Sequence, residues 1–285
     1  MSAAEAAVSE LLGIATSSSS ALSGSVYLVG TANGTVVAKR GAGVGAAPAE
    51  AAGLRWLAEP QAVPVPSVLG HNENWVVTEL LDNAAPSPAA AEQLGRGLAE
   101  LHAAGAPAFG SPPSGGPMDA WIGLAPMRNV PSPGWPEWYA EYRIQPYLRR
   151  ALDSGALHTS EAAVIDNVCE RIATLGVPPE LPSRLHGDLW NGNLQWDGEQ
   201  AWLIDPAAHG GHRETDLAML RLFDCPYLDR ILGAYREVAP LADGWAERVP
   251  LHQLYPLLVH TVLFGGGYAR QAVAAARQAL TLHSR

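Results

Sequence analysis

Residues 184–205 read RLHGDLWNGNLQWDGEQAWLID and place two carboxylates and one amide at defined spacings. Asn193 follows Asp188 by five positions, and Asp205 closes the apolar run that comes next. Phosphoryl transfer from ATP needs a carboxylate that orients the attacking hydroxyl and receives its proton, together with oxygen ligands for Mg²⁺. Because Mg²⁺ keeps most of its water and phosphate ligands, few protein ligands are needed. The spacing therefore predicts Asp188 as a catalytic base, with Asn193 and Asp205 as ligands of Mg²⁺.

A β-hairpin is predicted between the two expected metal ligands. Two short apolar segments flank the turn sequence Asp-Gly-Glu-Gln at 197–200. Such a hairpin brings Asn193 and Asp205 side by side at its open end, as shared coordination of one ion requires. Each of these residues alone would more often be structural. The five-residue spacing of the kinase catalytic loop, with His186 two positions before Asp188, favours chemistry.

Composition and charge argue against several classes of function. The 285 residues include 18 Lys or Arg and 28 Asp or Glu, for a net charge of −10. Nucleic acids and anionic membranes call for a basic surface, so neither is an expected partner. The longest apolar segment, 251–263, is interrupted by polar residues and a proline, so no membrane span is expected. The N-terminal residues lack the basic and apolar regions of a signal peptide.

The two cysteines predict no disulfide and no metal site. Cys169 and Cys225 are far apart in sequence, and no metal-type pair of cysteines is present. Two reduced thiols are the expected state, which is typical of a cytoplasmic protein. The length allows one large domain or two smaller ones, and the sequence leaves the choice between a monomer and a weak homodimer open.

The first 80 residues predict a small antiparallel sheet with helices. After a helix over 3–14, a serine-rich segment at 16–25 precedes an apolar strand, an Asn-Gly hairpin turn and a return strand that ends at Lys39. The serine-rich segment is predicted to be a flexible loop whose amides cover phosphates, and Lys39 to pair with the α- and β-phosphates. Alternatively, the segment is a mobile linker and Lys39 a solvated lysine.

A helix that begins near Pro48 offers a partner for this lysine. Glu50 in that helix is the expected ion-pair partner of Lys39, although by itself it would be a surface residue. The apolar run at 75–80 predicts the last strand of the sheet, which then enters a hinge facing the adenine base. The predicted hinge residues are Glu79, Leu80 and Leu81.

Helical patterns dominate after residue 80. Ser87 is an expected N-cap, Pro146 an expected kink and Ser160 a second N-cap. The helical segments are 88–102, 135–150, 160–176, 217–223, 227–238, 251–264 and 269–282. The prediction is therefore an α+β molecule, in which a small lobe of residues 1–80 joins a larger, mainly helical lobe of residues 81–285.

Several separated segments together resemble the fructosamine kinase (ketosamine kinase) family, a branch of the protein-kinase-like and aminoglycoside-phosphotransferase-like fold. The segment at 186–193 looks like the family's catalytic loop, in which Trp190 separates it from many other small-molecule kinases. The other similar segments are 121–123 with Pro126 and Asn129, 204–207, 211–214, 216–219, 254–260 and 264–268. Together they span most of the chain, and their combination is far more specific than His-Gly-Asp alone.

The resemblance implies a two-lobed fold and phosphorylation of a sugar hydroxyl on a ketosamine, the rearranged adduct of a sugar and an amine, with ATP and Mg²⁺. It also implies that Lys39 and Glu50 set the phosphates, that Asp216 anchors the backbone of the catalytic loop, and that His186 supports the site. By itself Asp216 would be an ordinary carboxylate at the start of a helix. Two features depart from the family. The serine-rich segment has fewer glycines than a phosphate-covering loop should have, and Met127-Arg128 fits the family's insert less well.

Three residues are candidates for contact with the sugar. Sugars stack on aromatic faces and hydrogen-bond with polar side chains, which suggests Trp190, Trp121 and His260. Trp190 lies two positions after Asp188 and would flank the acceptor. Each of the three could equally be a core aromatic residue or a satisfied core histidine.

Two other functions stay open. An aminoglycoside- or choline-type kinase would share the fold, and a strongly acidic acceptor pocket would favour it. A pseudokinase that binds a nucleotide without catalysis would lack the base, a metal ligand or the lysine, and all four residues are present here.

Overall fold

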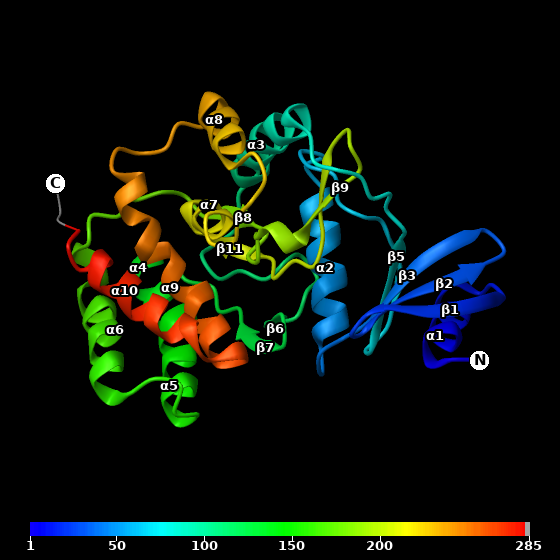
Figure 1. Ribbon diagram of the computed structural model, residues 1–285, viewed down its shortest axis with the longest axis horizontal. Helices are drawn as coiled ribbons and strands as arrows, with labels where there is room; N and C mark the ends of the chain where they lie inside the picture. Colours follow the sequence, from blue (N-terminus) through cyan, green and yellow to red (C-terminus); the bar gives the residue numbers. More distant parts are fainter. Residues whose placement is uncertain (283–285) are drawn as a thin grey trace.

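The computed structural model describes residues 1–282 as a small sheet at one end and a larger helical part at the other (Figure 1). The five-stranded antiparallel sheet has the order β1-β2-β3-β5-β4. Its strands are β1 (Thr16–Ser23), β2 (Val26–Thr31), β3 (Gly34–Arg40), β4 (Val68–His71) and β5 (Trp75–Glu79). Helix α1 (Ala3–Leu12) packs on the sheet, and α2 (Ala46–Ala58) lies between the sheet and the helical part.

The serine-rich segment is a strand, so the prediction of a flexible loop is wrong. Residues 16–23 pair antiparallel with β2, with register shifts near both ends of the strand. Serine is a poor strand former, but β1 is an edge strand whose side chains are mostly exposed, so polar residues cost little there. Only the turn at 23–25, where Gly24 has a φ of 45°, remains as a loop that can cover phosphates.

The helical part contains most of the remaining chain. Its helices are α3 (Pro88–Ala103), α4 (Trp135–Trp138), α5 (Gln145–Asp153), α6 (Thr159–Arg171), α7 (Glu214–Leu220), α8 (Leu228–Val238), α9 (Trp245–Phe264) and α10 (Gly267–Ala279). Three two-stranded pairs join them: β6 (Asp119–Ile122) with β7 (Ala125–Arg128), β8 (Ser183–Leu185) with β11 (His209–Gly211), and β9 (Leu194–Trp196) with β10 (Ala201–Leu203). The α+β class and the two-part arrangement predicted from the sequence are confirmed.

Each predicted helical segment coincides with a helix, with local corrections. The N-cap of α6 is His158, whose N–H bonds Glu161, and Ser160 lies inside the helix. A π-helical turn at 139–144 directly precedes α5, whose first turn contains Pro146. Proline lacks the N–H that continues an α-helical ladder, so an irregular turn at this position has a direct cause. The short strands β4, β6, β7, β8 and β11 were not predicted.

Two further expectations concern chemistry rather than fold. Cys169 and Cys225 are both free, the first partly exposed and the second buried. Among residues 1–282, no helix is long and apolar enough to cross a membrane.

Candidate active site

A cavity of about 340 Å³ is lined by residues from the sheet, α2, the β6–β7 hairpin and the segment after β8. Seven of the residues singled out in the sequence meet in its lining: Lys39, Glu50, Trp121, Asp188, Trp190, Asn193 and Asp205. They come from five separate segments of the chain, which are brought together by folding.

Lys39 connects the sheet to two carboxylates. Its Nζ lies 2.9 Å from Glu50 Oε2 on α2 and 2.9 Å from Asp205 Oδ1. Burial opposes the charge on Lys39, but the two neighbouring carboxylates outweigh it and raise the pKa of the ammonium group. Burial raises the pKa of Glu50, against the attraction of Lys39. Lys39 is therefore a fixed positive charge at the wall of the cavity.

Asp188 is held by the amide of Asn193. Asn193 Nδ2 donates to Asp188 Oδ2 at 3.0 Å and to the Asp188 carbonyl at 2.8 Å. Burial raises the pKa of Asp188 to about 7, and the negative charges of Asp205 and Asp216 add to this against the Asn193 bond and Lys39. A carboxyl group with this pKa accepts and releases a proton near neutral pH, which is the property required of a general base.

The predicted hairpin places Asn193 and Asp205 together. The Ile204 N–H donates to the Asn193 carbonyl at 3.1 Å, and the adjoining strands β9 and β10 pair antiparallel. Asp205 has a φ of 53°, a left-handed conformation that is costly for a residue with a side chain and that concentrates at functional sites. This conformation leaves the Asp205 carboxylate half-exposed at the cavity.

The donor set suits Mg²⁺. Because the Nδ2 atom of Asn193 is used as a donor, its Oδ1 remains as an acceptor. Lys39 occupies Oδ1 of Asp205, which leaves Oδ2. Two hard oxygen atoms beside an open cavity are the kind and number of protein ligands that Mg²⁺ takes at phosphate sites.

Asp216 supports the loop that carries Asp188. Its two carboxylate oxygens accept the N–H groups of His186 and Gly187 at 2.8 and 2.9 Å. His186 also bonds the Ile204 carbonyl at 2.9 Å, which ties the loop to the open end of the hairpin. Gly187 has a φ of 81°, and a Cβ there would overlap the Ala207 carbonyl. The loop thus requires glycine between His186 and Asp188.

Sequence reasoning missed His102, which extends these hydrogen bonds from Asp216 to Tyr235. His102 Nε2 lies 3.3 Å from Asp216 Oδ2, and its Nδ1 bonds the Tyr235 hydroxyl at 2.9 Å. The signal in the sequence was a polar residue on the buried face of α3, where leucines precede it at 94, 98 and 101.

The two tryptophans lie in the cavity and His260 does not. A Cβ at Gly192 would overlap the Trp190 ring, so glycine allows that ring to lie over the loop. Trp121 packs on Gly43 and donates from Nε1 to the Val44 carbonyl at 3.1 Å. His260 lies outside the lining and bonds the Pro256 carbonyl at 2.7 Å.

The predicted hinge also lies outside the cavity lining. Glu79, Leu80 and Leu81 follow β5, and none of them lines the cavity. Glu79 Oε1 accepts the Ser67 N–H at 2.7 Å, and the Leu81 carbonyl accepts from Gln195 at 3.4 Å.

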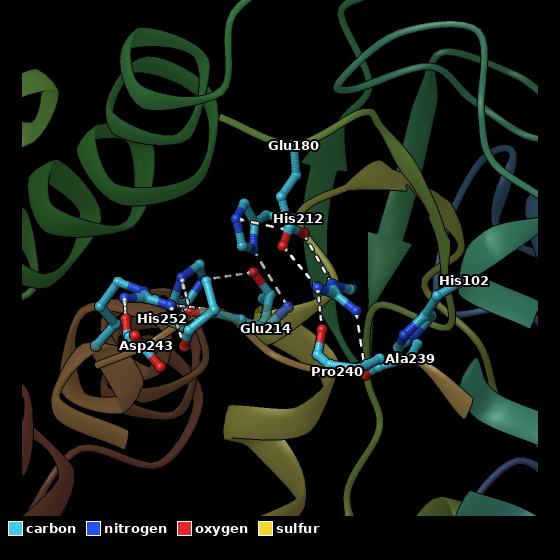
Figure 2. Close-up of polar contacts among 12 residues, drawn as sticks. His102, Glu180, His212, Glu214, Ala239, Pro240, Asp243 and His252 are labelled. Carbon is cyan, nitrogen blue, oxygen red and sulfur yellow. Dashed lines mark hydrogen bonds and ion pairs between the residues drawn. The ribbon is translucent and has the colours of Figure 1, made fainter. Parts of the chain in front are cut away.

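A second cluster of charged residues is buried in the helical part (Figure 2). Arg248 donates from Nε and Nη2 to the two oxygens of Glu214, at 2.9 and 2.6 Å. His252 Nε2 lies 3.3 Å from Glu214, and His212 points toward Glu180. These four residues, Glu214, Arg248, His212 and His252, are called the buried cluster below, and all are at most 4% exposed.

The buried cluster resembles a metal site only in part. Ligand atoms of His212, Glu214 and His252 lie within 4.8 Å of one another. Both oxygens of its one carboxylate, however, already bond Arg248. A divalent cation would place further positive charge beside a buried guanidinium, which is costly. The arrangement is that of a salt bridge joining α7 to α9.

The chain is similar to known proteins of one family. The family model described as fructosamine kinase matches residues 39–282. A crystal structure of a protein described as a fructosamine-3-kinase, from Thermobifida fusca, is 47% identical with a TM-score of 0.91, covering 98% of each chain. A relative in Synechocystis, described as a ketoamine kinase, is 33% identical over 82% of this chain and 78% of its own. A protein-ribulosamine 3-kinase of Arabidopsis thaliana is 32% identical over 79% of this chain and 69% of its own.

Proposed function

The chain belongs to the fructosamine kinase family, and we propose from this premise that it transfers the γ-phosphoryl group of ATP to a sugar hydroxyl of a ketosamine. The observation that carries the proposal is the meeting of Asp188, Asn193, Asp205 and Lys39 in one cavity. Relatives described as ketoamine, ribulosamine and fructosamine kinases support the choice of acceptor.

Asp188 is the proposed base. As the acceptor hydroxyl attacks the γ-phosphorus, its proton passes to the Asp188 carboxylate, and the bond from phosphorus to the ADP oxygen breaks. A pKa of about 7, raised by burial, leaves a substantial fraction of Asp188 ionised at neutral pH. Asn193 orients the carboxylate through its bond to Oδ2.

Asn193 and Asp205 are the proposed ligands of Mg²⁺. When bound there, the ion supplies positive charge that offsets the charge on the transferring phosphoryl group. Lys39 holds the α- and β-phosphates and keeps its ion pair with Glu50, whose position on α2 fixes the lysine. When phosphates replace Asp205 as partners of Lys39, Oδ1 of the Asp205 carboxylate becomes available.

The remaining assignments follow the same scheme. Residues 1–80 form the lobe that covers the nucleotide and 81–285 the lobe that carries the acceptor, with adenine against Glu79, Leu80 and Leu81. Asp216 and His186 support the loop without touching the substrate, and Trp190 and Trp121 flank the acceptor. The two free cysteines favour a cytoplasmic location.

The cavity gives little support to an aminoglycoside-type acceptor. Among the described residues that line it, the carboxylates are Glu50, Asp188 and Asp205, which all have proposed roles in the phosphoryl transfer. The acceptor side is lined instead by Trp121, Trp190 and apolar residues. A polycationic acceptor would find no further acidic groups there.

The test is Mg²⁺-dependent consumption of ATP with a panel of synthetic ketosamines, the corresponding free amines and aminoglycosides. Turnover of ketosamines alone is the expected result. Turnover of aminoglycosides alone would contradict the acceptor class while keeping the fold and the base. Tight binding of ATP with no turnover of any acceptor would contradict the assignment as an active kinase.

A further inference from the structure

Five aromatic side chains form a continuous cluster that begins inside the cavity and ends at the surface. Trp190 contacts Phe223 edge to face, with ring centroids 5.5 Å apart. Phe223 contacts His260 at 4.9 Å, and His260 contacts Tyr268 at 5.0 Å and Phe264 at 5.5 Å. Trp190, Phe223, His260, Phe264 and Tyr268 are called the aromatic cluster below. The first comes from the loop that carries Asp188, and the last three from the junction of α9 and α10.

The outer end of the aromatic cluster faces solvent. Phe264 is 65% exposed, and Phe223, His260 and Tyr268 are partly buried. A contiguous apolar patch at a surface marks an interaction site or a ligand-binding groove. Their side chains have few rotatable bonds, so they bind a ligand with a small loss of conformational entropy.

The cavity wall continues toward this cluster on a second side. Leu124, at the turn of the β6–β7 hairpin, lines the cavity and is 70% exposed. Gly123 of the same turn lies against Leu263 of α9, the residue before Phe264. An apolar rim therefore runs from the hairpin turn to the end of α9.

The charge state of His260 suits a cationic ligand. Its Nδ1 must donate to the Pro256 carbonyl, which leaves Nε2 as an acceptor. Burial lowers the pKa of His260, so its ring is neutral at neutral pH and does not repel a cation. Aromatic faces attract cations through their quadrupoles, most strongly in the case of tryptophan.

From these observations we infer that the aromatic cluster is the subsite for the amine-bearing half of the ketosamine, and that it favours amines with an aromatic or extended apolar group. The inference rests on the proposed function. A ketosamine has a sugar half, which must reach Asp188, and a nitrogen that is protonated at neutral pH because aliphatic amines have pKa values of about 8–10. With the sugar hydroxyl at Asp188, the amine half extends past Trp190 onto Phe223, His260, Phe264 and Tyr268.

The experiment compares two ketosamines that share one sugar, one made from benzylamine and the other from glycine. The variant Phe264→Ala removes an exposed ring at little cost to folding, and Phe223→Leu removes a ring while keeping most of its volume. Leu181→Ala, at a residue 87% exposed in the segment between α6 and β8, is the matched control. Steady-state kinetics give kcat and KM for each acceptor and for ATP.

The expected result for Phe264→Ala is a rise in KM for the benzylamine adduct of about threefold to tenfold, the range of one aromatic contact. The KM of the glycine adduct should change less than about twofold, since its amine half has no ring to pack on Phe264, and kcat and the KM of ATP should stay unchanged. Phe223→Leu should act in the same direction.

Equal effects on both adducts, or none in either variant, would overturn the subsite. Failure of the wild-type chain to phosphorylate any ketosamine would instead contradict the proposed function, so the two failures are distinguishable.

Discussion

Two groups of charged side chains in this molecule use similar chemistry in opposite surroundings. The cavity cluster, which comprises Lys39, Glu50, Asp188 and Asp205, combines three carboxylates with one ammonium group beside an open cavity. In the buried cluster one carboxylate, Glu214, is fully paired with one guanidinium, that of Arg248, away from solvent.

The difference lies in charge balance and access. The cavity cluster has a surplus of negative charge, which complements Mg²⁺ and contributes to the high pKa of Asp188. The buried cluster is balanced and closed, and its salt bridge holds α7 against α9. We therefore expect substitutions in the first cluster to change activity and substitutions in the second to change stability.

The largest expected effect is on turnover in Asp188→Asn. Loss of the base should lower kcat by about 10² to 10⁴-fold. The unfolding midpoint should stay the same or rise, because a neutral amide replaces a carboxylate that is costly to bury. Steady-state kinetics measure kcat and thermal unfolding measures the midpoint, and Asp229→Asn on the exposed surface of α8 is the control. Retention of activity would show that another group takes the proton.

Arg248→Met should have the largest effect on stability. Removal of the guanidinium leaves Glu214 buried and without its partner, which costs about 3–5 kcal/mol of unfolding free energy. Chemical denaturation measures this loss, and Arg236→Met on exposed α8 is the control.

The double variant Glu214→Gln/Arg248→Met sharpens this second test. It removes both charges and should recover part of the lost stability. At temperatures well below its midpoint, Arg248→Met should keep a kcat within about threefold of the wild type. A loss of turnover as large as that of Asp188→Asn would remove the distinction between the two clusters.

The two clusters also differ in how well the sequence alone predicts them. Asp188, Asn193 and Asp205 fall within 18 residues, and the hairpin between them has a local turn signal, so spacing alone predicted their meeting. The salt bridge of Glu214 and Arg248 spans 34 residues, and nothing in the local sequence pairs them. Arg248 also lies two residues before Pro250, where a helix was not expected to run.

The wrong prediction for residues 16–25 has a related cause. The serine-rich composition favoured a loop. Pairing with β2 instead forms backbone hydrogen bonds, which do not depend on the serine side chains. His102 was missed because its partner Asp216 is 114 residues away. Contacts set by tertiary structure were thus the ones that the sequence did not reveal.

A third effect concerns the pH dependence of stability. Burial lowers the pKa of His212 to about 3, against about 6.5 in an unfolded chain. The folded state therefore binds fewer protons, and stability present above pH 6.5 is lost as the pH falls toward 3. His212→Asn should reduce the slope of unfolding free energy against pH in this window by about 1.4 kcal/mol per pH unit. Equal slopes in the wild type and in His212→Asn would contradict the buried neutral state.

The smallest effect is expected for an ion pair that is exposed to solvent and lies away from the cavity. Arg96 Nη2 lies 3.3 Å from Glu237 Oε2, with side chains 45% and 64% exposed. Solvent screens such a pair, so Glu237→Gln should change the unfolding free energy by less than about 0.5 kcal/mol and leave kcat unaltered. Chemical denaturation at low and high salt measures both the size and the screening. A loss above about 1 kcal/mol would mean that burial does not determine how much an ion pair contributes to the unfolding free energy here. The stability assigned to the buried cluster would then need another explanation.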